Sequence, residues 1–201
     1  MKKFILGTKQ NMTQYWGEDG KVSPATVVVA GPITVTQVKT GDKDGYTALQ
    51  VGYGEQKKER LSKSVLGHTK DAAYKTLREF RAEDAGKAVG DIIDVSAFEK
   101  GDMVVVAGIS KGKGFQGVVK RHGFHGDKRT HGRKHSERKP GSIGGGLRTR
   151  VPKGMRMAGR MGNDRVSVKN LEVLLVDKAT NTILIKGALP GRRGTLLEIT
   201  A

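Results

Sequence analysis

The chain has 201 residues, with 37 lysines and arginines against 20 aspartates and glutamates, which gives a formal net charge of +17. It has no cysteine, which excludes disulfide bonds, cysteine-ligated zinc and thiol catalysis. No apolar run approaches the roughly 20 residues that cross a bilayer, and the apolar stretch Phe4–Leu6 is too short for a signal peptide. We therefore expect a cytoplasmic chain with a polyanionic partner.

Short β-branched or alternating segments, separated by turn residues, occur in both the first and the last part of the chain. This pattern is typical of half-buried strands. We expect strands at Ala25–Ala30, Ile33–Lys39, Tyr46–Tyr53, Ile92–Val95, Met103–Ile109, Val166–Val168, Leu171–Val176 and Thr182–Lys186. Many short strands joined by turns indicate a mainly β fold, either closed or sandwich-like.

One region, from Lys57 to Glu83, has apolar residues at helical spacing. We expect two short helices here, interrupted at Gly67-His68, with Asp71 capping the second and Gly86 just beyond its end. The spacing thus predicts a helical insert at about residues 57–90.

The charge is concentrated between Ser110 and Arg165. This segment has 16 basic and 3 acidic residues, a net charge of +13, which leaves only +4 for the rest of the chain. It is rich in glycine and histidine, and its few apolar anchors include Phe115, Phe124 and Ile143. Such a segment buries too little apolar surface to fold alone, so we interpret it as an insertion between strands that binds folded RNA.

A glycine pattern at Gly112–Gly117 matches the G-x-G-x-x-G of dinucleotide-binding proteins, and with Val119 it matches the kinase glycine loop. The dinucleotide pattern must open a helix within a βαβ unit, and here Gly123 follows almost at once. The chain also lacks the other kinase motifs. We therefore expect these glycines to let the backbone approach phosphates, with Lys111 and Lys113 as counter-charges.

Four histidines, His122, His125, His131 and His135, lie close together in the basic segment. A metal site is disfavoured because almost no carboxylate accompanies them and the many neighbouring cations repel a divalent ion. Neutral imidazoles can instead contact bases, phosphates or ribose hydroxyls. We therefore expect no metal and no cofactor.

The predicted RNA contacts are the basic side chains of this segment together with three of its histidines. The phosphate contacts are Lys111, Lys113, Lys120, Arg121, Lys128, Arg129, Arg133, Lys134, Arg138, Lys139, Arg148, Arg150, Lys153, Arg156 and Arg160. The base or sugar contacts are His122, His125 and His131.

Several alternatives fit the sequence less well. A membrane-surface protein would need an amphipathic basic helix, which the glycines forbid. DNA binding is less firmly disfavoured, because no helix suited to the major groove is visible. A free RNA chaperone would favour exposed aromatic platforms, yet aromatic residues make up only 5%. A metal- or nucleotide-dependent enzyme is disfavoured because the glycine pattern and the histidine cluster lack the neighbouring elements and ligands that such an enzyme needs.

Ordered sequence blocks along nearly the whole chain also resemble a known family. They are Gly7–Thr13, Ala30–Pro32, Val35–Thr40, Asp44–Tyr46, Gln50–Tyr53, Ser110–Arg121, Thr130–Gly132, Pro140–Gly144, Met157–Gly162 and Lys186–Gly191. In these blocks the chain resembles the bacterial form of the universal large-subunit ribosomal protein L-three family.

The resemblance implies a translation-protein-type β-barrel with a small α+β insert and a long basic, glycine-rich loop. On this chain the barrel domain would be residues 1–119 and 161–201, and the loop residues 120–160. The family is not enzymatic. It binds large-subunit rRNA near the 3′ end early in assembly, and its loop extends toward the peptidyl transferase centre. Implied neighbours are ribosomal proteins L-fourteen, L-nineteen, L-thirteen and L-seventeen, with no membrane and no small-molecule substrate.

The chain departs from the family pattern at a few positions. Asn11 stands where the opening motif usually has glycine. Asparagine tolerates a left-handed backbone, so the turn can be kept. Gly145–Gly154 lacks the glutamine that some members methylate, so that modification is not expected here.

Overall fold

The computed structural model describes residues 3–82, 86–146 and 149–201, and the chain divides into two compact units. The barrel unit comprises Met1–Ile109 and Arg165–Ala201, and the basic unit comprises Ser110–Asp164. The basic unit therefore also takes in residues 110–119 and 161–164, which the sequence analysis assigns to the barrel domain. Among the described helices, none is long and apolar enough to cross a membrane.

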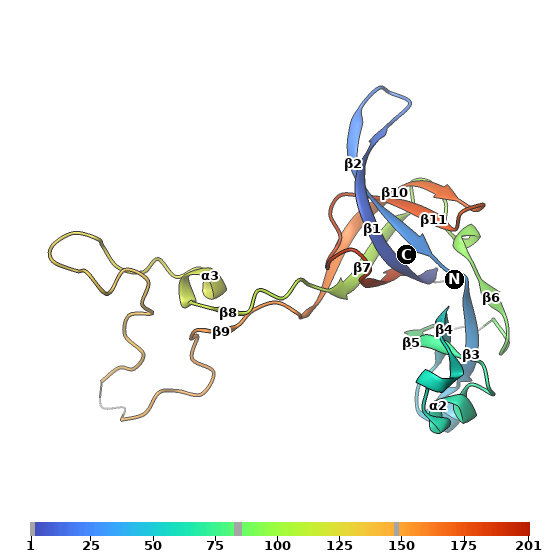
Figure 1. Cartoon of the computed structure of the whole chain (residues 1–201), viewed down its shortest axis with the longest axis horizontal. Helices are drawn as coiled ribbons and strands as arrows, with labels where there is room; N and C mark the ends of the chain where they lie inside the picture. The colour runs from blue at the N-terminus through green and yellow to red at the C-terminus, as the bar shows by residue number, and fades with distance from the viewer. Residues whose placement is uncertain (1–2, 83–85, 147–148) are drawn as a thin grey trace. The chain divides into compact units, whose positions relative to one another are not determined.

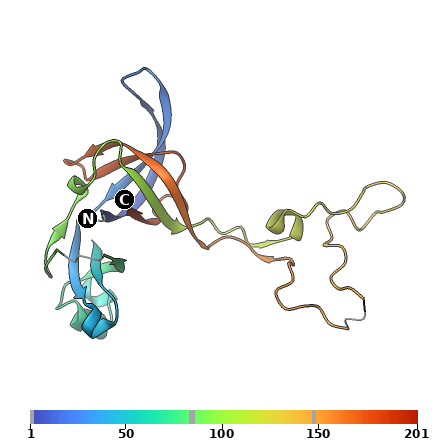
Figure 2. The ribbon, with the colours of Figure 1, turned by 180° about the vertical axis from the view of Figure 1, so that it is seen from behind.

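Six antiparallel strands close the barrel (Figures 1 and 2). Their order around the barrel is β1 (Phe4–Trp16), β12 (Leu196–Thr200), β7 (Met103–Ile109), β10 (Arg165–Asp177), β11 (Thr182–Lys186) and β2 (Val22–Ala30). Pairing of Phe4 with Thr200 brings the two ends of the chain to neighbouring strands. The expected mainly β fold class is confirmed. Of the two expected architectures, closed and sandwich-like, the structure has the closed one.

Alternating burial along the strands gives the barrel its core. Ile183 and Ile185 of β11 are fully buried, as are Leu197 and Ile199 of β12, while the residues between them are partly exposed. Because neighbouring side chains of a strand point to opposite faces, each alternate residue enters the core.

A second sheet packs against the same core within the barrel unit. Its strand order is β5 (Tyr74–Arg81), β4 (Ala48–Glu55), β3 (Ile33–Lys39) and β6 (Ile92–Ile93). The Phe80 ring stacks on Phe4 of the barrel, with 4.5 Å between ring centroids. The short helices of this part are α1 (Gly41–Asp44), α2 (Lys63–His68) and the 3₁₀ turns Lys58–Arg60 and Val95–Ala97.

The expected second helix is wrong, because Tyr74–Arg81 forms strand β5. This strand pairs with β4 from Ala48↔Arg81 to Glu55↔Tyr74, and the Tyr74 ring lies over Gly52, where a Cβ atom would collide with it. Tertiary pairing thus overrides a short helical spacing. Asp71 caps no helix and has φ of 64°, whereas the cap of α2 is Ser62, whose side chain accepts from the Val65 N–H.

Strands β1 and β12 are not predicted from the sequence. In β1 the residues Phe4, Ile5 and Leu6 are buried in succession, and the pairing with β2 shifts between Lys9 and Met12. Such a bulge breaks the alternation on which strand prediction depends.

We expect Ile199→Ala to lower the free energy of unfolding by about 2–5 kcal/mol, because it leaves a cavity in a closed core. The measurement is urea unfolding of the full chain. The matched control is Ile92→Ala, whose side chain is 64% exposed and whose loss should change stability by less than about 0.5 kcal/mol. Equal effects of the two variants would contradict this assignment of the core.

Candidate nucleic-acid interface

An antiparallel backbone ladder joins the two ends of the basic unit. The Ser110 N–H donates to the Asp164 carbonyl at 2.9 Å, and Lys113 and Met161 continue the ladder toward β8 (Phe115–Gln116) and β9 (Gly159–Arg160). At Gly162, with φ of 79°, a Cβ atom would collide with the Lys111 carbonyl oxygen. The ladder thus places Lys111, Lys113 and Arg160 near one another.

The helix α3 (Val118–His122) follows β8 and ends at Gly123, whose φ is 72°. This is the structural context of the G-x-G-x-x-G pattern: Gly117 is the N-cap of a five-residue helix, and β8 and β9 pair antiparallel. A βαβ dinucleotide unit is therefore absent from the described part of this unit. The sequence analysis does not predict α3.

Two side chains of α3 bind the segment that precedes β9. Arg121 Nη1 donates to the Met157 carbonyl at 2.7 Å, and His122 Nε2 lies 3.1 Å from the same oxygen. Because a carbonyl oxygen only accepts, His122 Nε2 carries the proton. These two predicted RNA contacts therefore also have a role within the protein.

A second cluster holds the segment after α3. The Asp127 N–H donates to the Glu137 carbonyl at 3.0 Å, and a Cβ atom on Gly126 would collide with that oxygen. Arg129 pairs with Glu137 at 2.6 Å, and Arg133 donates to Asp127. Two of the three acidic residues of the basic unit are thus paired locally.

The ion pair changes the acidity of Asp127. The Arg133 guanidinium donates to the carboxylate, the Lys128 N–H adds a second hydrogen bond, and together they lower the pKa of Asp127 below its usual 3.8. Because folding lowers this pKa, the charged carboxylate adds to the free energy of unfolding at pH values above its ordinary pKa. That contribution is lost as the pH falls through the lowered pKa.

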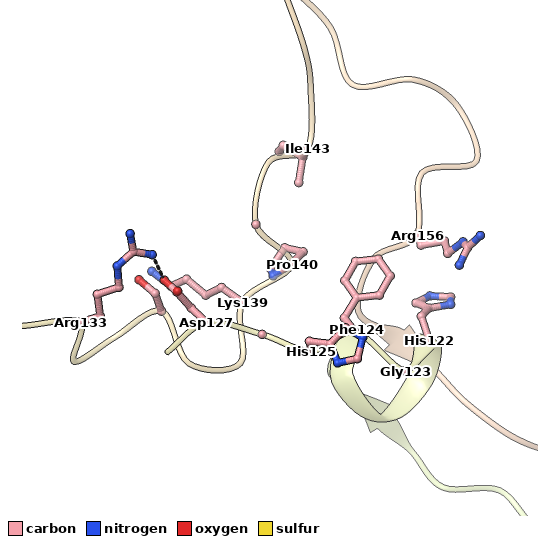
Figure 3. A pocket seen from close by; sticks show the side chains of 13 residues that line it. His122, Gly123, Phe124, His125, Asp127, Arg133, Lys139, Pro140, Ile143 and Arg156 are labelled. Atoms are coloured by element: carbon pink, nitrogen blue, oxygen red, sulfur yellow. Dashed lines mark hydrogen bonds and ion pairs between the residues drawn. The ribbon is translucent and has the colours of Figure 1, made fainter. Parts of the chain in front are cut away.

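A cavity of about 800 Å³ lies within the basic unit (Figure 3). Its lining combines cationic, aromatic and apolar side chains with the backbone of several glycines. The lining residues are His122, Gly123, Phe124, His125, Gly126, Asp127, Arg133, Ser136, Lys139, Pro140, Gly141, Ile143 and Arg156.

The structure exposes nearly all of the predicted contact residues. Of those it describes, His122 is half-buried and the others are exposed. The cavity brings together His122, His125, Arg133, Lys139 and Arg156, whereas the remaining predicted residues are spread over the rest of the unit. Arg148 lies outside the described residues.

The cavity is lined by Phe124 and Ile143, two of the sparse apolar anchors of the sequence. It is also lined by Pro140, which was not predicted as a site residue. Its signal in the sequence is the pair Pro140-Gly141, which marks a turn. Among the described residues, no group of three His, Asp or Glu side chains could hold a metal ion.

An exposed, cation-dense unit inserted between strands of a small closed β-barrel is the architecture expected of a polyanion-binding protein. Residues 79–183 match the family model described as ribosomal protein L3. The chain belongs to this family, known as uL3, and the resemblance seen in the sequence is confirmed.

Curated relatives match the chain over nearly its whole length. Large ribosomal subunit protein uL3 of Herpetosiphon aurantiacus is 49% identical over 98% of this chain and 94% of its own. The proteins of the same name from Geobacter sulfurreducens and from a Picosynechococcus species are 48% and 49% identical, over 99% and 97% of this chain and 97% and 94% of their own.

We expect Arg133→Gln to raise the pKa of Asp127 toward its ordinary value, because the largest cause of the lowered pKa is the hydrogen bond from Arg133. The measurement is an NMR titration of the labelled carboxyl carbon in the full chain. Arg129→Gln is the control, since Arg129 pairs with Glu137 and should leave the pKa of Asp127 unchanged. An Asp127 titration that is the same in all three proteins would contradict the ion pair.

Proposed function

We propose that this chain is a structural constituent of the large ribosomal subunit, where it binds large-subunit rRNA mainly through the basic unit. The observation that carries the proposal is the density of exposed cations there: Ser110–Asp164 has 15 lysines and arginines against 3 acidic residues, a net charge of +12. Membership of the uL3 family supports the same role.

The physical reason lies in what each unit buries. The described core cluster draws all of its buried residues from the barrel unit. The basic unit has few apolar contacts of its own, so the main favourable free energy for ordering it comes from neutralising phosphates. The barrel then serves as the folded base on which the basic unit is carried.

The finer role follows the family resemblance. We propose that the chain binds near the 3′ end of the large rRNA early in assembly and that residues 120–160 extend toward the peptidyl transferase centre. Its proposed neighbours are L-fourteen, L-nineteen, L-thirteen and L-seventeen, and its role in the ribosome is structural rather than enzymatic.

Replacing Gly117–Ala158 with an Asn-Gly turn removes most of the basic unit but keeps the directly paired residues Gln116 and Gly159. We expect the barrel to stay folded, because the described core cluster includes none of the removed residues. Incorporation into large subunits, measured on sucrose gradients, should fail or stall.

Two outcomes would contradict this proposal. Loss of the cooperative thermal transition in the shortened chain would show that the barrel does not fold independently of the basic unit. Normal assembly of the shortened chain would show that the basic unit is not the anchor.

The salt dependence of binding tests the same assignment in purified components. For a full-length large-subunit rRNA transcript we expect a slope of log K against log salt steeper than about −6. Changing five exposed cations of the basic unit to glutamine should make the slope shallower by about 3.5, at roughly 0.7 for each lost phosphate contact. These are Lys113, Lys128, Lys134, Arg138 and Lys153.

The matched control removes the same number of exposed cations from the barrel unit. They are Lys57, Lys58, Arg60, Lys63 and Lys70. We expect this control to change the slope by less than about 1. Equal changes in the two variants would place the phosphate contacts over the whole surface rather than in the basic unit.

A further inference from the structure

Three segments of the basic unit converge on the cavity: the end of α3 with the residues that follow it, the segment from Arg133 to Ile143, and Arg156. Its volume of about 800 Å³ lies within the range of sites that enclose small molecules, roughly 300–1,000 Å³. The cavity is therefore large enough to hold one nucleotide, and all of its lining residues belong to the basic unit.

The walls of the cavity are fixed by contacts that do not use its apolar lining. On one side the backbone bond from Asp127 to Glu137 and the ion pair between Asp127 and Arg133 join two of the segments. On the other side the Met157 carbonyl holds the His122 ring. Phe124, Pro140 and Ile143 thus remain available to a ligand.

Phe124 gives the cavity an aromatic surface. Figure 3 shows its ring pointing into the space between Pro140 and Ile143 on one side and His122 and Arg156 on the other. The His122 ring is tilted by 45° against it, with 6.0 Å between centroids. One face of a planar ligand can therefore stack on an aromatic ring while its edges meet polar groups.

The charge of the lining selects an anion. Asp127 is paired with Arg133, so Lys139 and Arg156 supply the positive charge that a ligand meets. Both side chains are exposed, and Figure 3 draws them on opposite sides of Phe124, so a phosphate on either side of a stacked base meets one of the two cations. A planar ring with an attached phosphate satisfies the two kinds of lining at once, whereas an acidic peptide satisfies only the cations.

We propose that this cavity holds one unpaired nucleotide of the bound RNA, with its base stacked on Phe124 and its phosphate at the rim of the cavity, on the side of either Lys139 or Arg156. This inference rests on the proposed function and makes it more specific. A base inside a helix cannot enter, because stacked neighbours cover both of its faces and pairing occupies its edge. The cavity therefore recognises a nucleotide that the folded RNA has turned out of its helices, and single-stranded RNA is commonly recognised by such stacking.

The test uses large subunits assembled with the full chain and its variants. Phe124→Leu keeps an apolar side chain of similar size but removes the ring, and Phe124→Tyr keeps the ring. Phe115→Leu is the matched control, since Phe115 lies in the same unit but outside the cavity and is 75% exposed. Dimethyl sulfate and carbodiimide report the reactivity of each rRNA base, and hydroxyl radicals report the backbone footprint.

In Phe124→Leu we expect the reactivity of one unpaired base to rise at least about five-fold, because loss of the ring removes its stacking partner. The backbone footprint should persist, which also shows that the variant is folded. Phe124→Tyr should restore protection of that base, and Phe115→Leu should leave it protected.

The other outcomes overturn the proposal. If base reactivities are the same in wild type and Phe124→Leu while the footprint is intact, the cavity encloses no nucleotide, and the proposed function stands without it. If reactivity rises over the whole footprint, Phe124 has only a packing role. If the wild-type chain leaves no footprint on the rRNA, the proposed function itself fails.

Discussion

The pairing of β7 with β10 is the constraint on which the rest of the structure depends. Ile109 and Arg165 are directly paired in the barrel, and the 55 residues between them form the basic unit. Closing so long a loop costs entropy that grows with its length, and the unit has almost no core to offset that cost. Barrel strands that already lie side by side hold the two ends together before any partner is bound, and the backbone ladder from Ser110 and Asp164 continues this pairing into the unit.

The acidic residues of the basic unit shape the chain more than they reduce its charge. Asp127 and Glu137 each pair with an arginine a few residues away, and the Asp127 N–H donates to the Glu137 carbonyl, which closes the segment between them. Exposed ion pairs of this kind contribute little to stability. Their effect is to fix the path of the backbone, while the described lysines and arginines without such a role are exposed to solvent. The proposed binding of RNA therefore also favours ordering of the unit, since phosphates reduce the repulsion among the cations.

The mainly β class could be predicted from sequence because part of the core follows local alternation, as in Ile183 and Ile185, whereas the barrel itself was implied by the family resemblance. Prediction failed where a longer-range contact decides the conformation. The spacing of Leu77 and Phe80 fits a helix, but pairing with β4 makes this segment a strand. In β1, a bulge and four successive buried residues, Phe4–Gly7, conceal the alternation.

For the candidate site, composition identified the region and most of its exposed cations, because charge density needs no tertiary information. It could not identify the cavity, since His122, Lys139 and Arg156 are far apart in sequence and converge through backbone contacts such as that between Asp127 and Glu137. The sequence likewise cannot predict that the Glu137 carbonyl oxygen lies so close to Gly126 that no Cβ atom fits there.

The way the cavity is built explains how a unit with so little apolar surface can still be selective. A site made by packing would have to bury its aromatic and aliphatic side chains against one another. Here backbone hydrogen bonds and contacts to the carbonyl groups of Glu137 and Met157 hold the walls, so Phe124 stays half-buried and turned toward the cavity. Phosphate contacts alone do not distinguish one RNA sequence from another. A stacking surface that admits only an unpaired base adds recognition of RNA shape to charge neutralisation, and it does so in the part of the chain where charge is greatest.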